Sequence, residues 1–152
     1  MTSRQTDRPD RRGSNRSQGA VLLAVALGGG LGAVARYGLA QWWPTPPGGF
    51  PWATFVTNVT GCFLIGVLMV AVAEIWIAHP LIRPFLGVGV LGGFTTFSTY
   101  ANEIGELLRP GEAMVACVYL VGTLASALLA TVAAMRLTRA CYDSLRHRRA
   151  VR

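Results

Sequence analysis

The sequence GGFTTFSTY at residues 92–100 lies in the middle of an apolar segment that runs from residue 81 to residue 108. In lipid, an unpaired backbone polar group is so costly that irregular backbone persists only when it is buried in protein or lines a cavity. Two glycines and four Ser and Thr hydroxyls therefore fit poorly in an uninterrupted lipid-facing helix. As one helix, the segment would also be about 42 Å long, against a hydrocarbon core of about 30 Å. The sequence predicts a membrane helix that is broken at its centre, where transport proteins often bind their substrates.

Three further apolar segments accompany this one, at residues 20–41, 52–78 and 113–135. Each reaches the roughly 20 residues that a helix needs to cross a bilayer. Of the 152 residues, 52% are hydrophobic and only 14% are charged, whereas soluble domains carry about 25% charged residues. We therefore expect an all-α membrane protein with four transmembrane helices.

The ends of the chain differ in composition from this membrane domain. Residues 1–19 are rich in Arg, Ser, Asp and Gly, which is typical of a disordered tail. Residues 138–152 are basic and could extend the last helix. The predicted organisation is thus a basic N-terminal tail at 1–19, a transmembrane domain at 20–137 and a basic C-terminal tail at 138–152.

The arginines predict how the helices are oriented. With four spans, both termini lie on one side of the membrane, and 12 arginines would lie on that side. Arg109 alone would lie on the other side, and Arg36 lies within the first segment. Because positively charged loops stay in the cytoplasm, both termini are predicted to be cytoplasmic. The net charge of +7 could also indicate nucleic-acid binding, but topology and contact with anionic membrane lipid explain it better. We therefore expect lipid and no nucleic acid as a partner.

The cysteines and histidines show no spacing that is typical of a metal or catalytic site. Cys62, Cys117 and Cys141 form no CxxC pattern, and neither His79 nor His147 accompanies them. Free cysteines in such positions usually act as small apolar side chains. We therefore do not expect an enzyme.

The first apolar segment combines small residues with one charge. Gly28 and Gly32 form a GxxxG pattern, which lets two helices approach closely. A guanidinium within a span is expensive and faces a partner, a water-filled vestibule or the membrane surface. We interpret Arg36 as a candidate vestibule residue, with snorkelling to the outer surface as the alternative.

Polar side chains recur at helical spacing in the second and fourth segments. Thr54 and Asn58 share one helical face, as do Tyr119 and Thr123. The Asn58 amide offers two N–H donors and one acceptor. Such a face either bonds a neighbouring helix or lines a substrate path, and a broken helix nearby favours the second interpretation.

The broken segment itself supplies hydroxyls, carbonyls and rings. Its Ser and Thr hydroxyls can pair with the backbone groups that the break releases, and unwound carbonyls suit a hard cation such as Na⁺. Phe97 and Tyr100 are three residues apart, so both rings face the same way once the helix resumes. Core packing would explain that spacing equally well. Glu103 and Glu106 follow near the outer end, where we expect no more than a solvated rim.

Three blocks of sequence resemble the Fluc (CrcB-type) fluoride channels. They are GG-x-x-GA-x-x-RY at residues 28–37, T-x-x-x-N-x-x-G-x-F-x-x-G at 54–66 and GGFTTFST at 92–99. Their order and the four-span layout agree with that family over residues 20–137. The sequence departs from the family at Tyr100, where a phenylalanine is usual, and at Ala53 and Ala127.

The resemblance implies a dimer of antiparallel subunits with two fluoride pores, in the plasma membrane of a prokaryote. A structural Na⁺ at the dimer centre would be held by the main-chain carbonyls of Gly92 and Thr95. The resemblance implies a fluoride path along side chains from three segments: Asn58, Phe97, Ser98, Thr99, Tyr100, Tyr119 and Thr123. The expected function is passive export of F⁻ from the cytoplasm, which lowers fluoride toxicity.

The uneven distribution of arginine suggests how such a dimer assembles. A chain that inserts both ways needs nearly balanced Lys and Arg on its two sides, and this chain is lopsided. We hypothesise a subunit of fixed topology that pairs with an oppositely oriented paralogue, so a non-conducting partner subunit is one alternative. A small four-helix multidrug or cation exporter is another, although its chemistry needs an acid within the first span, where this chain has only Arg36.

Overall fold

The computed structural model describes residues 11–75, 79–109 and 111–150, with side chains from residue 18 to residue 148 within those ranges. No strand occurs in these ranges. The elements in chain order are α1 (Arg11–Trp42), α2 (Trp52–Val70), η1 (Ala71–Ile75), η2 (Pro84–Leu91), α3 (Gly92–Phe94), α4 (Ser98–Leu108) and α5 (Ala113–Ala150). The elements η1 and η2 are π-helices, which wind more widely than α-helices. The prediction of an all-helical chain is confirmed for the described residues.

Three of the described helices are long and apolar enough to cross a membrane, at Gln18–Trp42, Trp52–Ile75 and Ala113–Arg148. The fourth predicted span, at residues 81–108, is divided among η2, α3 and α4, which have 8, 3 and 11 residues. None of these pieces alone has the length of a span. The number of four transmembrane helices therefore stays a prediction.

The break that the sequence predicts lies between α3 and α4. Helix α3 ends at Phe94 and α4 begins at Ser98. Between them, Thr95 has an extended backbone, with φ −74° and ψ 157°, although its N–H still donates to the Leu91 carbonyl at 3.0 Å. The backbone thus leaves the helix for three residues and then resumes it.

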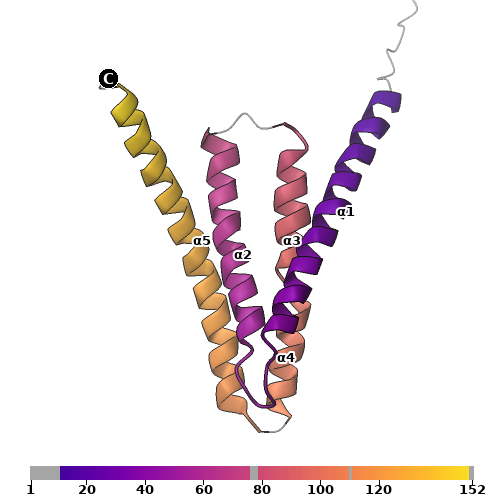
Figure 1. Ribbon diagram of the computed structural model, residues 1–152, viewed down its shortest axis with the longest axis vertical. Helices are drawn as coiled ribbons and strands as arrows, with labels where there is room; N and C mark the ends of the chain where they lie inside the picture. Colours follow the sequence, from indigo (N-terminus) through magenta and orange to yellow (C-terminus); the bar gives the residue numbers. More distant parts are fainter. Residues whose placement is uncertain (1–10, 76–78, 110, 151–152) are drawn as a thin grey trace, which may run out of the picture.

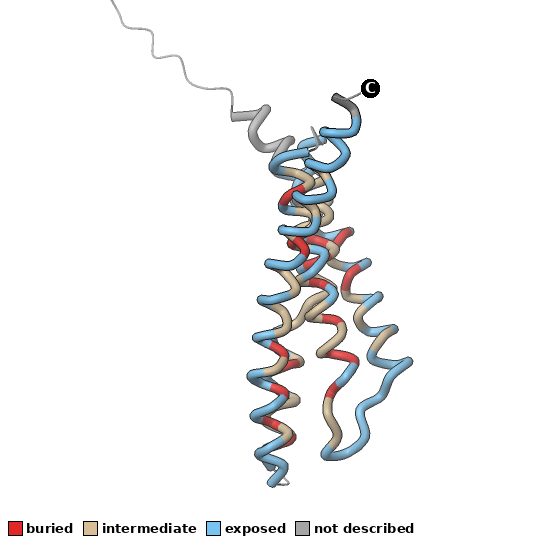
Figure 2. The backbone as a smooth tube through the Cα atoms, turned by 90° about the vertical axis from the view of Figure 1, so that its left-hand side faces the viewer, coloured by how far each residue is buried: buried red, intermediate tan, exposed pale blue. Residues whose placement is uncertain are grey.

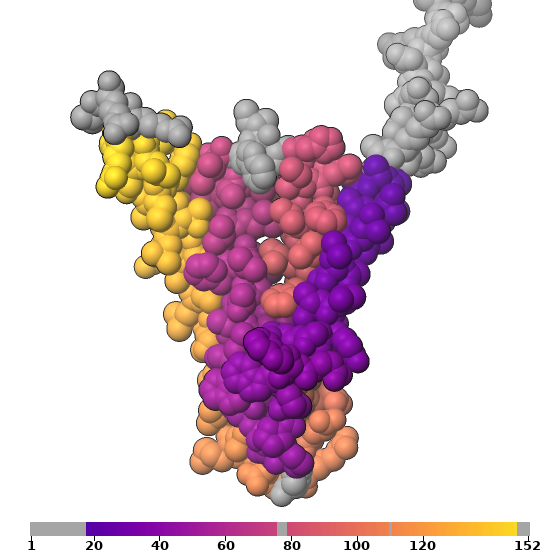
Figure 3. All heavy atoms as spheres, in the orientation of Figure 1, coloured from indigo at the N-terminus to yellow at the C-terminus, as the bar shows by residue number. Residues whose placement is uncertain are grey.

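The helices form two packed pairs, shown in Figure 1. Helix α2 packs along α5, whereas η2 and α3 pack along α1, and α2 touches η2 far less. The pairs meet near α4 and diverge toward the end where α1 begins and α5 ends. Figure 3 shows α1 and α5 standing apart at that end. The start of α1 and the end of α5 therefore lie on the same side of the described structure.

Glycines bring α1 close to the backbone of η2 and α3. A methyl group on Gly32 would lie 2.7 Å from the Phe94 nitrogen, and one on Gly28 would lie 3.0 Å from the Val90 nitrogen. The first distance is too short for a real side chain, and a methyl group on Gly28 would also clash with the Phe85 carbonyl. The close helix approach that the GxxxG pattern predicts is therefore confirmed, and its partner is the backbone of the broken segment.

Figure 2 shows short buried stretches that alternate with intermediate and exposed residues along the helices. The buried core around Tyr100, Leu107, Ala116 and Tyr119 joins α4 to α5. Large apolar side chains such as Leu31, which is 61% exposed, cover the outside. Such a surface suits hydrocarbon rather than water.

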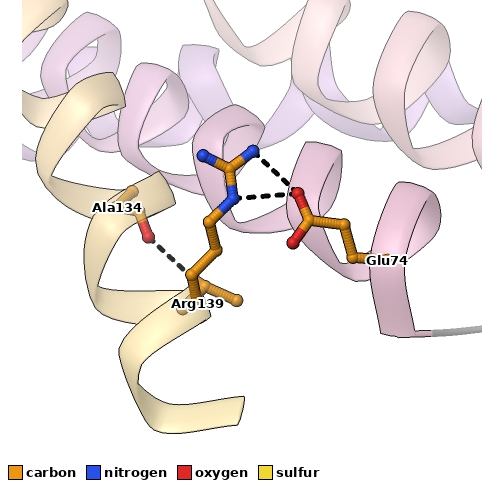
Figure 4. Close-up of polar contacts among 4 residues, drawn as sticks. Glu74, Ala134 and Arg139 are labelled. Carbon is orange, nitrogen blue, oxygen red and sulfur yellow. Dashed lines mark hydrogen bonds and ion pairs between the residues drawn. The ribbon is translucent and has the colours of Figure 1, made fainter. Parts of the chain in front are cut away.

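The two terminal helices extend into the segments for which tails are predicted. Helix α1 begins at Arg11 and α5 continues to Ala150, while residues 1–10 and 151–152 lie outside the described part. Arg139 of α5 forms an ion pair with Glu74 of η1, with 2.7 Å between the guanidinium Nη2 and the carboxylate (Figure 4). This contact joins the C-terminal part of α5 to η1, which continues α2.

Candidate functional site

Asn58 and Thr96 form a reciprocal pair of hydrogen bonds across the break. The Asn58 Nδ2 donates to the Thr96 carbonyl at 2.9 Å, and the Thr96 N–H donates to the Asn58 Oδ1 at 2.8 Å. The side chain thus binds both backbone groups of one peptide-bonded residue, as a neighbouring strand would. Since a primary amide has two N–H donors, one further N–H of Asn58 can bind a ligand.

This pairing removes a hydrogen-bond donor from the Gly92 carbonyl. In a continuous helix, the N–H of residue i+4 donates to the carbonyl of residue i. The N–H that would serve Gly92 belongs to Thr96, and it donates to Asn58 instead. Likewise, the N–H of Thr99 donates to the Thr96 Oγ1 at 3.2 Å rather than to the carbonyl of Thr95. Gly92 and Thr95 are the two predicted Na⁺ ligands. The N–H groups that would donate to their carbonyls in a regular helix donate to side-chain oxygens instead.

The Thr96 hydroxyl organises the start of α4. It accepts the Thr99 N–H, as the side chain of a helix-capping residue does. It also donates to the Thr99 Oγ1 at 3.1 Å and lies 3.4 Å from the Ser98 Oγ. Thr95 Oγ1 donates to the Leu91 carbonyl at 3.0 Å. The expectation that hydroxyls pair with backbone at the break is confirmed for Thr95 and Thr96.

Arg36 reaches the break from α1. Its Nε donates to the Gly93 carbonyl at 3.2 Å, and the side chain is half-buried. The guanidinium therefore lies beside the carbonyl of Gly93 in α3, just before the break, and it brings a positive charge there. Its predicted place in a vestibule is not tested by this contact.

The rings of Phe97 and Tyr100 lie next to each other but in different surroundings. Their centroids are 6.0 Å apart with an angle of 54° between the planes. Phe97 is 79% exposed, whereas Tyr100 is 9% exposed. The Tyr100 hydroxyl donates to the Leu120 carbonyl of α5 at 2.6 Å. The hydroxyl that distinguishes Tyr100 from phenylalanine therefore binds the α5 backbone.

Glu103 joins three helices through its two carboxylate oxygens. Thr54 Oγ1 of α2 donates to its Oε1 at 2.8 Å, and the Tyr119 hydroxyl of α5 donates to its Oε2 at 2.6 Å. The sequence interpretation of Glu103 as a solvated rim residue missed this role. Its signal was a carboxylate within a predicted span, since such groups are rare there and have a specific partner.

Thr123 lies buried on α5, and its hydroxyl is unpaired among the described residues. It is 4% exposed, and among the described residues its Oγ1 has no hydrogen-bond partner. A buried hydroxyl without a partner costs about 1–3 kcal/mol, so most buried hydroxyls are paired. The Thr123 hydroxyl is therefore well suited to bind a ligand.

A row of aromatic rings leads from the loop between α1 and α2 to the break. Phe50, in the loop between α1 and α2, meets Tyr119 edge to face with 5.1 Å between centroids. Tyr119 in turn meets Tyr100 at 5.1 Å, and Tyr100 meets Phe97 at 6.0 Å. These contacts hold Tyr119 where its hydroxyl reaches Glu103.

The fold and the site define a class of protein. Apolar helices of spanning length accompany an unwound segment, where amide donors, hydroxyls and carbonyls come together. Among the described residues, no cluster of three or more His, Cys, Asp or Glu side chains could hold a metal ion. Such an arrangement is typical of a membrane transport protein or ion channel. Comparison with known proteins identifies the family.

Residues 23–135 match the family model described as CrcB-like protein, Camphor Resistance (CrcB). The chain is 64% identical over 113 residues to the fluoride-specific ion channel FluC 2 of Nocardia farcinica, covering 74% of this chain and 81% of that protein. It is 50% identical over 137 residues to FluC 1 of Streptomyces coelicolor, covering 86% and 89% of the two chains. The chain belongs to the CrcB family of fluoride ion channels. These relatives are ion channels, which are not enzymes.

Proposed function

We propose that this chain is a subunit of a fluoride-selective channel in a prokaryotic cell membrane, through which F⁻ leaves the cytoplasm passively. The observation that carries the proposal is the Asn58–Thr96 pair, which holds an unwound backbone open at the depth of a membrane span. Neutral HF enters a cell from acidic surroundings and dissociates inside. An anion channel then lets the trapped F⁻ leave down its electrochemical gradient, which lowers its toxicity.

The donors around the break would replace the water that a small, strongly hydrated anion loses. The remaining Asn58 N–H and the Thr123 hydroxyl are two such donors. The N-terminus of α4, which begins at Ser98, adds the positive end of a helix dipole, and the hydroxyls of Ser98 and Thr99 lie in its first turn. Tyr119 donates its own hydrogen to Glu103, so we propose that it lines the path with its ring.

The exposed ring of Phe97 supports a path that two subunits share. An aromatic ring carries partial positive charge at its edge, and that edge can face an anion. Phe97 is 79% exposed although it belongs to the break, so a partner subunit would cover it. This is the arrangement that we propose for an antiparallel dimer with two pores. The ring of Tyr100 would pack against Phe97, while its hydroxyl donates to the Leu120 carbonyl of α5.

The carbonyls of Gly92 and Thr95 fit a sodium ion. Both have lost the N–H donor of a regular helix, and carbonyl oxygens are ligands for a hard cation. Na⁺ at the dimer centre would supply positive charge beside the path and join the breaks of the two subunits. The guanidinium of Arg36, bound to the intervening Gly93 carbonyl, would hold these carbonyls in place.

The lopsided charge supports a partner of opposite orientation. Of 14 basic residues, 12 would lie on the side of the termini, which we propose is cytoplasmic, and one on the other. Streptomyces avermitilis has two relatives of this chain, named FluC 2 and FluC 3, so paralogues occur together in the family. Purification of the tagged chain from its own cells should bring down a paralogue. A functional channel built from this chain alone would refute the heterodimer.

Two other functions make different predictions. A non-conducting partner subunit would give no flux of its own and would support flux when paired. An exporter of drugs or cations would need an acid in the first span, and α1 contributes Arg36 to the break instead.

Fluoride efflux from proteoliposomes tests the proposal. Vesicles that contain the purified assembly should release F⁻ rapidly and Cl⁻ at least a hundredfold more slowly. Phe97→Ile keeps an apolar side chain but removes the ring edge, and it should lower F⁻ release at least tenfold. Equal release of F⁻ and Cl⁻ would refute fluoride selectivity.

A further inference from the structure

A groove with an apolar floor and one positive charge opens between α2 with η1 and η2. Its volume is about 250 Å³, and it is lined by Ile65, Leu68, Met69, Val72, Ala73, Arg83, Gly87 and Val88. The groove lies between the two helix pairs, on the side where they diverge (Figure 1). It is thus separate from the site at the break.

The depth of the groove matches one leaflet of a bilayer. Asn58 binds the break, which we expect near the centre of the membrane. Ile65 is about 10 Å and Val72 about 20 Å further along the helix, at 1.5 Å per residue. The hydrocarbon of one leaflet is about 15 Å deep, and its headgroups reach about 20–22 Å from the centre. The apolar floor therefore lies at the level of acyl chains, and the far end lies at the level of headgroups.

The charge at the groove is positive. Arg83 is exposed and precedes the first residue of η2. Glu74, the nearest acid along the chain, pairs with Arg139 at 2.7 Å, as Figure 4 shows. A guanidinium binds a phosphate through two parallel N–H donors, which is the strongest form of such a contact.

A glycine keeps the groove open. A methyl group on Gly87 would meet the Leu68 Cδ2 at 3.4 Å, which is ordinary contact, so a larger side chain there would fill the space. Val88, the next residue, is 64% exposed. An unbranched acyl chain suits such a shallow, apolar channel between two helices.

We propose that this groove binds one anionic phospholipid, with its phosphate on Arg83 and an acyl chain along Ile65, Leu68 and Val88. The lipid fills the space where the two helix pairs diverge and so holds them at a fixed distance. This role concerns lipid and does not depend on fluoride conduction.

Lipid retention by the full-length protein tests the proposal. The purified assembly is incubated with equal amounts of phosphatidylglycerol and phosphatidylcholine, and bound lipid is counted by native mass spectrometry. We expect at least fivefold more bound phosphatidylglycerol than phosphatidylcholine. Arg83→Gln should remove this preference. Gly87→Leu should lower retention of both lipids. The control Arg136→Gln, which removes the same charge from an exposed site outside the groove, should change retention by less than twofold.

Three results would overturn the proposal. The first is equal retention by Arg83→Gln and Arg136→Gln. The second is displacement of the lipid by glycerol 3-phosphate at the same concentration, which would indicate a site for free phosphate. The third is retention by isolated subunits that is lost in the assembly, which would mean that a partner chain covers the groove. If Gly87→Leu fails to assemble, the comparison of Arg83→Gln with Arg136→Gln still tests the proposal. Arg83 is exposed, so its substitution should not disturb the fold.

Discussion

The amide of Asn58 and the backbone of Thr96 hydrogen-bond to each other in both directions, at 2.9 and 2.8 Å, although Asn58 lies on α2 and Thr96 lies in the break between α3 and α4. This relationship explains how an unwound backbone persists at the depth of a membrane span. It satisfies the N–H and the carbonyl of Thr96, and it also withdraws the N–H that would close the helix onto Gly92. One side chain thus stabilises the break and releases the carbonyl that we propose as a cation ligand.

Asn58→Ala should destabilise the protein strongly. The substitution leaves the N–H and carbonyl of half-buried Thr96 without their side-chain partner, and a group without a partner costs about 1–3 kcal/mol where it is buried. The measurement is the midpoint of thermal or denaturant unfolding in detergent. Asn102→Ala is the matched control, because the Asn102 amide donates to exposed Glu106 on the same helix. A loss of stability no larger than that of the control would mean that the Asn58–Thr96 hydrogen bonds do not stabilise the break.

Gly32→Ala should also destabilise the fold, because its methyl group would press on the backbone of the broken segment, 2.7 Å from the Phe94 nitrogen. Overpacking of this kind costs about 1–3 kcal/mol. Gly30→Ala is the control, since nothing lies within 4 Å of a methyl group there, and it should be neutral or slightly stabilising through helix propensity. The stability of the two variants in the same detergent is the comparison. Equal stability would mean that α1 does not pack closely on the break.

Tyr100→Phe should lower stability modestly and leave fluoride efflux nearly unchanged. The Tyr100 hydroxyl donates to the Leu120 carbonyl at 2.6 Å, and the net worth of such a bond is about 0.5–1.5 kcal/mol. Because the hydroxyl is directed to α5, its removal should leave the anion path unchanged. A severalfold change in the rate of efflux would show instead that this hydroxyl meets the anion.

Thr123→Val should separate stability from conduction. The Thr123 Oγ1 is buried and has no partner among the described residues, so its loss should leave the stability unchanged or raise it. Efflux should fall at least fivefold if this hydroxyl binds fluoride. Thr131→Val is the control, since the Thr131 hydroxyl donates to the carbonyls of Cys62 and Ala127, and its efflux should remain within twofold of the unsubstituted protein. Equal efflux from both variants would remove Thr123 from the path.

The break and the close approach of α1 could be predicted from the sequence, because both follow from local composition. Two glycines and a run of hydroxyls cannot stay lipid-facing as a helix, and Gly28 and Gly32 mark a helix contact wherever the partner lies. Asn58 was also identified, since an amide within a span needs a partner. That its partner is the backbone of Thr96 depends on how two segments meet, which no local pattern encodes.

The hydrogen-bond partners of Glu103 and Tyr100 could not be predicted from the sequence, and the reason is physical. The extended backbone at Thr95 resets the rotation of the helix that follows, so periodicity before the break says nothing about the faces of α4. Phe97 and Tyr100 do lie beside each other at 6.0 Å, as their spacing predicts. Only the position of α5 makes one ring 9% exposed and leaves the other 79% exposed.

The most direct test of the central claim is the rate of fluoride efflux from proteoliposomes that contain the purified assembly with Asn58→Ala, with Asn102→Ala or without substitution. If the clamped break forms the fluoride path, the unsubstituted protein and Asn102→Ala should release fluoride at similar rates, and Asn58→Ala should release it at least tenfold more slowly. Efflux from Asn58→Ala as fast as from the unsubstituted protein would contradict the account.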